Sequence, residues 1–384
     1  MLSFYLAAFL GALCVGIFSV ALPLYLIDKF QITSFFLGLF AAIWAFLYAI
    51  IAIIAGNLCN TISQKKLILM NCILIAIIYF FIIMAKSLNQ IFLLGCFSAI
   101  SWGIFWTPLL SWLSHKVEPK KLTKTIGIYN ISWCSALAIG SFINGFFYKI
   151  YNWLPFVVIS ILSIINMIVI SKEPCLKHHY QNYQIEKKSI NNKKNIWDVD
   201  NLFLYLVWIL NFIGAMIICH FPKLAYSLNI DVIAISTIIS FISLSQCIMF
   251  FILTKKTFWK SKFWPFFTLQ SIICLGLLGI TLSNNIYLWA SVFLALGVLK
   301  SFTYFLSIFH SANDIENRSQ KVGIHEAIVG ISGSLGPLLG GIFVYYWGLK
   351  APYFLCFVIL GIATILEIGI FKFISNKKLK EKIA

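Results

Sequence analysis

Charge is what this sequence has least of. Only 11% of its 384 residues are charged, acidic residues number 12 against 29 lysines and arginines, and Arg318 is the sole arginine. Hydrophobic residues make up 61%, and the mean hydropathy is +0.94. Soluble domains have about 45–50% apolar and about 25% charged residues, and a chain of this length could not hide such an excess in water. These values exclude a soluble enzyme or a soluble binding protein.

Motifs for metal, redox and nucleotide chemistry are also missing. The ten cysteines are scattered, mostly within apolar runs, and no CxxC pair occurs, so we expect buried thiols rather than disulfides or a zinc site. The sequence has no glycine-rich phosphate loop followed by Lys and Ser or Thr, which argues against direct use of ATP. We therefore expect neither a metal nor a cofactor.

Long apolar runs fill most of the chain. A stretch of ~20 apolar residues crosses the hydrocarbon core of a bilayer as a helix, and the sequence accommodates twelve such stretches. The first has no Lys or Arg before it and is too long for a cleaved signal peptide, so we interpret it as a membrane helix. The predicted spans are residues 2–26, 34–57, 67–85, 90–113, 126–148, 153–171, 201–221, 232–253, 264–282, 286–309, 322–347 and 352–374.

The gap before the seventh span divides the chain into two sets of six spans. We predict an all-α membrane protein with twelve transmembrane helices in two pseudo-symmetric six-helix bundles. Residues 1–171 would form the first bundle, and 172–200 a basic cytoplasmic linker that carries six lysines. Residues 201–374 would form the second bundle, and 375–384 a cytoplasmic tail.

The positive charges lie on one side of this arrangement. When the gaps are assigned alternately to the two sides of the membrane, 23 of the 29 lysines and arginines fall on the side of the N-terminus and five on the other. Cytoplasmic loops carry the excess of Lys and Arg, so both termini are predicted in the cytoplasm of a cell with an inner membrane. The net charge of +17 thus indicates membrane orientation rather than a nucleic-acid partner.

The two halves of the sequence repeat each other. Pro23 near the end of the first span corresponds to Pro222 near the end of the seventh. Glycines at 127, 140 and 145 in the fifth span match glycines at 323, 336 and 341 in the eleventh, with the same spacing. Repeated six-helix halves imply a pair of bundles with a binding site at their interface, near the membrane midplane.

Two motifs bear a resemblance to the major facilitator superfamily. The eleventh span reads Gly330-Ile-Ser-Gly333-Ser-Leu-Gly336-Pro337-Leu-Leu-Gly340-Gly341, which is similar to a glycine-proline motif that the family usually has in span five of antiporters. The gap after span two reads Gly56-Asn-Leu58-Cys-Asn60-Thr-Ile-Ser-Gln-Lys65-Lys66. It resembles the family's cytoplasmic loop signature, with Asn60 where an aspartate is usual and Ser63 where a glycine is usual.

The resemblance implies transport of a solute by rocking of the two bundles about a central site. The glycines would let another helix backbone approach closely, and Pro337 would permit a bend, although simple packing glycines are an alternative. Lys65 and Lys66, with Gly56, would belong to a gate on the cytoplasmic side. If the family pattern holds, spans one, four, seven and ten line the cavity.

Lys300 is a charged residue in the middle of an apolar span, about 13 Å deep at 1.5 Å per residue. A charge there costs ~2.5–3.5 kcal/mol on insertion scales, which marks functional residues. Lys300 could bind an anionic group of the solute, or neutralise a carboxylate and switch during transport. A lysine that only reaches toward the membrane surface is the third alternative.

Glu326 is the natural candidate for a partner of Lys300, and its carboxyl could carry a proton across the transport cycle. It would lie about one turn inside the eleventh span, although an interfacial carboxylate in contact with water is equally compatible with the sequence. Asn130 holds the equivalent position in the first half and cannot titrate, so proton coupling would be asymmetric. Neighbouring His325 could assist, but a solvated interfacial histidine is the simpler expectation.

An aromatic and amide set completes the candidate site. These residues fall in apolar surroundings, where they could stack on or hydrogen-bond to a solute, or simply pack in the core. Trp102 and Trp106 are four apart and share a helix face. The set comprises Trp102, Trp106, Trp133, Asn211, Gln246 and Tyr304.

The sequence favours a secondary transporter that acts as a monomer on a small solute, with a proton or a counter-solute as the energy source. A membrane enzyme acting on a lipid-linked substrate is an alternative, and it would need acids or histidines clustered at one interface. A sensor that binds its ligand without moving it is another, and measured flux would exclude it.

Overall fold

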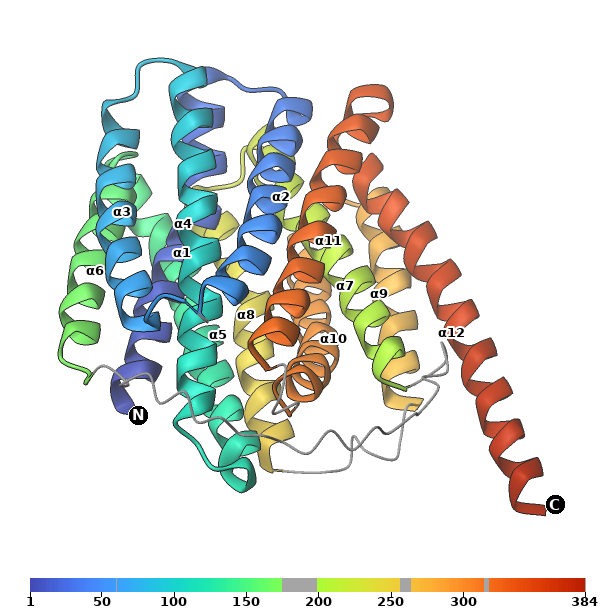
Figure 1. Cartoon of the computed structure of the whole chain (residues 1–384). Helices are drawn as coiled ribbons and strands as arrows, with labels where there is room; N and C mark the ends of the chain where they lie inside the picture. Colours follow the sequence, from blue (N-terminus) through green and yellow to red (C-terminus); the bar gives the residue numbers. More distant parts are fainter. Residues whose placement is uncertain (60, 175–198, 256–263, 314–317, 384) are drawn as a thin grey trace.

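A computed structural model describes residues 1–59, 61–174, 199–255, 264–313 and 318–383, and within these ranges the chain forms twelve helices (Figure 1). The predicted order of twelve helices is confirmed. The helices are α1 (Leu2–Phe30), α2 (Ser34–Leu58), α3 (Gln64–Met84), α4 (Leu88–His115), α5 (Pro119–Ile150), α6 (Leu154–Ser171), α7 (Val199–Ser227), α8 (Val232–Lys255), α9 (Trp264–Leu282), α10 (Ile286–Asn313), α11 (Arg318–Trp347) and α12 (Ala351–Ile383).

Apolar length and local caps explain these elements. Lipid offers no hydrogen bonds to the backbone, so a spanning segment must satisfy its own N–H and C=O groups as a helix. Within the described residues, eleven helices are long and apolar enough to cross a membrane, and the apolar part of α9, Phe266–Leu282, is shorter. A capping box of Ser87 and Gln90 starts α4, and the Thr33 hydroxyl accepts from the amide of Phe36 at the start of α2.

Several helices run past the predicted spans. Helix α5 begins seven residues before the predicted residue 126, and α12 is helical to Ile383, so most of the predicted tail 375–384 continues that helix. Hydropathy marks where lipid begins, whereas a helix can continue into water with polar residues. Most of the predicted linker 172–200 lies outside the described residues.

The helices form two groups that meet along two seams. In the first half α1 packs on α5 and α6, and α3 packs on α4 and α6. In the second half α7 packs on α11, α8 on α10, and α9 on α12. Between the halves α2 packs on α11 and α5 packs on α8. Both termini lie at the same end of the bundle (Figure 1), as an even number of crossings requires; we call this end the terminal face.

Close approaches at glycines repeat between the halves. A Cβ on Gly140 of α5 would collide with the backbone of α1, and one on Gly336 of α11 with the backbone of α7. Gly145 touches the backbone of α8, and Gly341 that of α2. In the six-span repeat α1 is equivalent to α7, and α2 to α8. The two glycines of each pair therefore contact equivalent helices. The glycines that repeat in the sequence thus make repeated contacts between helices.

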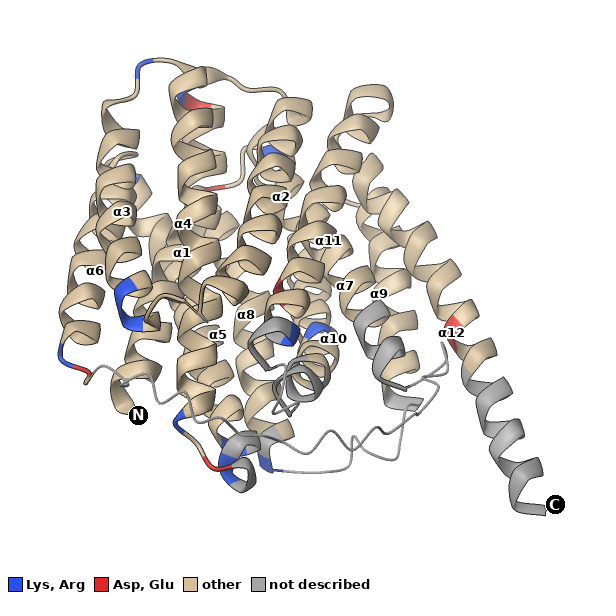
Figure 2. Ribbon diagram, viewed as in Figure 1, with Lys and Arg blue, Asp and Glu red and all other residues tan. Residues whose placement is uncertain are grey.

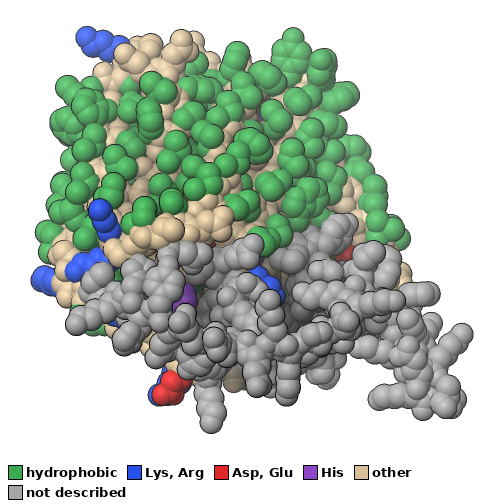
Figure 3. Space-filling model, viewed as in Figure 1, with side chains coloured by type: hydrophobic (Ala, Val, Ile, Leu, Met, Phe, Trp, Pro, Cys, Tyr) green, Lys and Arg blue, Asp and Glu red, His purple; other side chains and the backbone are tan. Residues whose placement is uncertain are grey.

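The outer surface suits lipid. Figure 3 shows hydrophobic side chains covering most of the visible described surface, and large ones are widely exposed, including Phe80, Phe97 and Leu275. Charged residues gather near the helix ends and leave the middle of the bundle almost free of them (Figure 2). Such an apolar belt fits a multi-pass membrane protein.

Candidate functional site

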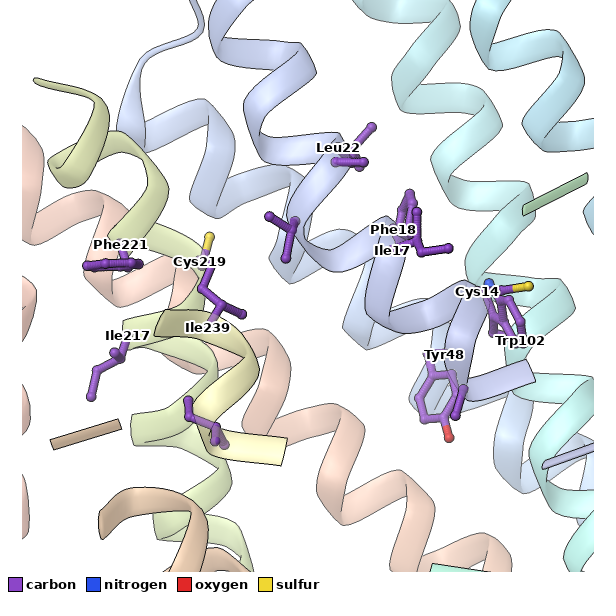
Figure 4. Close-up of a cluster of buried hydrophobic side chains, with 14 of the residues drawn as sticks. Cys14, Ile17, Phe18, Leu22, Tyr48, Trp102, Ile217, Cys219, Phe221 and Ile239 are labelled. Atoms are coloured by element: carbon purple, nitrogen blue, oxygen red, sulfur yellow. The ribbon is translucent and has the colours of Figure 1, made fainter. Parts of the chain in front are cut away.

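A central cavity of about 400 Å³ lies between the two halves. Helices α1, α2, α4 and α5 line it from the first half, and α7, α8, α10 and α11 from the second. Figure 4 shows buried side chains of both halves near it, with Phe18 and Leu22 on α1, Cys219 on α7 and Ile239 on α8. Among the described residues that line the cavity, Lys300 and Glu326 are the two charged side chains.

Lys300 lies on α10 and is half-buried. Its ammonium lies beside Gly214 of α7, where an added Cβ would be 3.0 Å from Nζ. Glycine at 214 therefore leaves room for the lysine side chain between α7 and α10. Nζ makes no ion pair or hydrogen bond with any residue that the structure describes. A lysine in this position presents uncompensated positive charge to the cavity.

Glu326 lies on α11, and two tyrosines hold its carboxylate. The Tyr48 hydroxyl on α2 donates to Oε2 at 2.6 Å, and the Tyr304 hydroxyl on α10 donates to Oε1 at 3.3 Å. Only 8% of the residue is exposed, which excludes the freely hydrated interfacial carboxylate. Tyr48 belongs to the first half, so the bond between Tyr48 and Glu326 joins the two halves across the cavity.

Each of these tyrosines stacks on a tryptophan. The ring of Tyr48 lies 5.8 Å from that of Trp44, with an interplanar angle of 6°. The ring of Tyr304 lies 5.6 Å from that of Trp133, with an interplanar angle of 10°. Trp44 is held in turn by a 2.8 Å hydrogen bond from its indole N–H to Ser98. Stacked rings have few rotamers available, so the two hydroxyls are aimed at the carboxylate by packing.

The structure brings most of the predicted site residues together at the cavity. Asn211 lies there with its amide N–H₂ already donating to Val329 and Ser332 of α11. The predicted residues that line the cavity are Trp106, Trp133, Asn211, Gln246, Lys300, Tyr304, Glu326, Gly333 and Pro337.

Trp102 and Asn130 do not line the cavity. The Trp102 indole is 1% exposed and donates to the Tyr79 hydroxyl at 3.1 Å, inside the first half. Its ring stacks on Trp106, so the shared face is present, but the cavity reaches only the later turn. On α5 it is Tyr129 that faces the cavity, and one residue further rotates Asn130 by ~100° away from it.

The predicted pairing of Lys300 with Glu326 is absent from this conformation. The ion pairs of the described residues do not include one between them, and both Glu326 oxygens are occupied by tyrosine hydroxyls. His325 is fully buried rather than solvated, and its Nδ1 lies 2.8 Å from the hydroxyl of Ser307. The expectation that His325 is solvated was wrong, because α10 covers this part of α11.

The glycine-proline motif holds α11 between α2 and α7. Gly336 and Gly340 face α7, Gly341 faces α2, and Gly333 makes an ordinary contact with Ala45. The carbonyl of Pro337 lies 3.0 Å from Nε2 of His220 on α7, a polar contact that the sequence analysis missed.

The residues predicted to belong to a cytoplasmic gate lie at and after the end of α2. Lys65 donates to the carbonyls of Ser171 and Glu173 at the end of α6, so its contacts stay within the first half. A lysine at a helix C-terminus also complements the helix dipole. Gly56 is buried and Lys66 is exposed, while Asn60 lies outside the described residues.

A second set of contacts joins the halves at the face opposite the terminal face. Lys149 at the end of α5 pairs with Asp231 before α8, at 3.0 Å. The Tyr148 hydroxyl donates to Asp28 of α1 close by. The Lys149 ammonium, as hydrogen-bond donor, holds the pKa of Asp231 below its ordinary value, with a smaller contribution from the amide of Ile233.

Sequence comparison places the chain among known families. The sequence profile of the Major Facilitator Superfamily matches residues 4–315. No curated protein matches the sequence significantly.

Solved structures share the fold at low sequence identity. A bacterial homologue of the human lysosomal transporter Spinster, in an inward-facing and occupied conformation, superposes with a TM-score of 0.74 at 15% identity, covering 97% of this chain and 96% of that one. The human organic anion transporter MFSD10 gives 0.73 at 10% identity, covering 95% and 97%. The nucleoside transporter NupG gives 0.67 at 13% identity, covering 97% and 98%.

Proposed function

The chain belongs to the Major Facilitator Superfamily, and on that premise we propose that it carries a small organic anion through the cavity between its two halves. It is a secondary transporter rather than an enzyme. The cavity is complete within one chain, which supports action as a monomer. The excess of lysines at the terminal face supports placement of both termini in the cytoplasm, with the protein in an inner membrane.

The observation that carries this proposal is the free ammonium of Lys300 in the cavity wall. A cation within the span of a membrane protein normally pairs with an anion, and the described residues supply none to Lys300. A carboxylate, sulfonate or phosphate of the solute would supply it. Binding would then combine a charge-assisted hydrogen bond with relief of the uncompensated charge.

The rest of the cavity supports a solute with a mostly apolar body. Aliphatic and aromatic side chains together make up most of the wall, and one of its amides, Asn211, already donates within the protein. A polar group of the solute left without a partner would cost about 1–3 kcal/mol. A flat or apolar group beside rings such as Trp106 and Trp133 avoids this cost.

Glu326 supports a proton as the coupling ion. It is the one carboxyl among the described lining residues, it is buried, and its neighbours Tyr48 and Tyr304 can both donate and accept hydrogen bonds. A carboxyl in such surroundings can exist in either protonation state as the cavity changes its access to water. Asn130 cannot share this role, because an amide does not titrate.

Substitution of Lys300 tests the anion proposal. In purified protein, a library of organic anions and their neutral amide or ester analogues is screened by thermal stabilisation, since a ligand selective for the native state raises its melting temperature. We expect anions to stabilise the wild type and Lys300→Arg, and Lys300→Met to lose this stabilisation. In proteoliposomes, Lys300→Met should lose at least about tenfold of the flux of the anion found.

The control separates a lost site from a lost fold. Lys350 also lies near a helix end of the second half, where it donates to the carbonyl of Thr281, and it is remote from the cavity lining. Lys350→Met should retain anion binding. If neutral analogues stabilise the wild type as well as the anions do, or if Lys300→Met binds anions normally, the assignment of Lys300 is wrong.

A further inference from the structure

We propose that Tyr48 is a positioning residue for Glu326, and that protonation of Glu326 releases the contact between α2 and α11 by weakening the bond from Tyr48. This rests on the proposed role of Glu326 as proton carrier and assigns to it the mechanical consequence of carrying the proton.

The geometry makes Tyr48 the link between the halves. Its hydroxyl lies 2.6 Å from Glu326, against 3.3 Å for that of Tyr304. Tyr304 is on α10, in the same half as Glu326, whereas Tyr48 comes from α2 of the other half. A short bond from hydroxyl to carboxylate is about twice as strong as a bond between neutral groups. Breaking it is therefore part of the cost of separating α2 from α11.

The backbone around this bond is closely packed. A Cβ on Gly330, one turn after Glu326, would collide with Ala45 and Ala49 of α2. The small residues let the two helices approach until Tyr48 reaches the carboxylate. The position of Tyr48 along α2 is thus fixed by helix packing, and the direction of its ring by the stack on Trp44.

Protonation of Glu326 by itself changes the contact between Glu326 and Tyr48. A proton from water in the cavity binds one carboxylate oxygen, and the charge of the group goes from −1 to zero. That oxygen becomes a donor, so the tyrosine facing it must turn its hydroxyl and accept instead. Two charge-assisted bonds become weaker neutral ones, and the link between α2 and α11 loses strength.

Other titratable groups near Glu326 do not make the same link. The Tyr304 hydroxyl lies within its own half, and the His325 imidazole faces Ser307. Among the described lining residues, α1, α4 and α8 contribute no titratable side chain, and α2 contributes only Tyr48. The titratable groups that line the cavity with Glu326 are Tyr48, Tyr129, Cys219, Lys300 and Tyr304, and His325 is its neighbour in the chain.

Thiol labelling at the seam between α2 and α11 tests the inference. Ala52 is fully buried at this seam, where Gly323 of α11 meets its carbonyl. The single-cysteine variant Ala52→Cys, with the native cysteines replaced, is labelled in proteoliposomes over a range of pH. We expect labelling to accelerate about tenfold as the pH falls in the wild-type background. In Tyr48→Phe it should be fast at every pH.

Two further variants keep the outcomes distinct. Tyr79→Phe removes a buried hydroxyl of the same half that bonds Trp102 instead of Glu326, and it should retain the pH dependence. Glu326→Gln should abolish it. If Glu326→Gln abolishes the pH dependence and Tyr48→Phe preserves it, Tyr48 is not the link and this inference fails alone. If Glu326→Gln still responds to pH, the proton-carrying role in the proposed function fails as well.

Discussion

Two ionisable side chains and the rings around them determine what the cavity can bind. Lys300 offers a positive charge without an acid beside it, and Glu326 offers a carboxyl already held by tyrosines. The two groups therefore have separate roles in this conformation. Lys300 is available to a solute, and Glu326 is available to a proton.

The two stacked tryptophans of α4 should separate binding from stability. Trp106 lines the cavity and Trp102 does not. We expect Trp106→Ala to weaken anion binding about tenfold, because a ring contact is worth about 0.5–1.5 kcal/mol beyond its area. Trp102→Phe removes the hydrogen bond to Tyr79 and should lower stability by about 1 kcal/mol with binding unchanged.

Binding titrations and thermal unfolding of both variants check this assignment. An equal loss of affinity in Trp102→Phe and Trp106→Ala would show that the cavity extends to the earlier turn, contrary to the structure.

The limits of prediction at this scale are physical. Lys300 and Glu326 could be found from the sequence because a charge inside an apolar run is costly and therefore conspicuous. Tyr48 could not, because a tyrosine is ordinary in such a run and its partner lies 278 residues away. Whether Lys300 pairs with Glu326 stayed open for the same reason, since the sequence gives the depth of a side chain but not which neighbour it meets.

At the scale of helices, the two seams between the halves share close glycine contacts but differ in their polar contacts. The seam of α2 and α11 is closed by glycines and by the bond from Tyr48 to Glu326. At the face opposite the termini, an exposed ion pair joins α5 to the start of α8. An exposed pair contributes ~0.2–1 kcal/mol, so this end should be the easier one to perturb.

Charge reversal at Lys149 and Asp231 tests the contribution of this ion pair. Lys149→Glu places like charges together, and we expect labelling of a cysteine at Ile233, beside Gly145, to accelerate a few-fold. Adding Asp231→Lys should restore the slow rate. The pKa of Asp231 is lowered from 3.8, so the pair persists at any pH above about 4 and is lost only as the pH falls through that lowered pKa. Failure of the double variant to restore the rate would show that the pair does not hold this end.

Helix order and pairing were more accessible to prediction than helix ends. Each apolar run had to be a helix in lipid, and matched glycine spacings predicted matched contacts, which α5 and α11 show. The start of α5 and the end of α12 were misplaced because hydropathy marks only the apolar part of a helix. Both helices continue beyond that part with polar residues.

For the whole molecule, the cavity lies between the halves, where α2 packs on α11 and α5 packs on α8. Rocking of the halves would loosen these two seams in turn. The exterior is apolar between the two faces, and the charged residues lie mainly near the helix ends (Figure 2). Membership of the superfamily supplies the expectation of alternating access. The buried cavity with its free lysine supplies the expected site.

Access to one cavity residue from both sides of the membrane tests this account most directly. Ala215 of α7 lines the cavity, so Ala215→Cys in a background without other cysteines places one thiol there. A membrane-impermeant reagent, applied in turn to each side of oriented proteoliposomes, should label this thiol from both sides. The anion found in the stabilisation screen should slow both reactions, and Lys300→Met should remove that protection. Labelling from one side alone, with the anion present or absent, would contradict transport through this cavity.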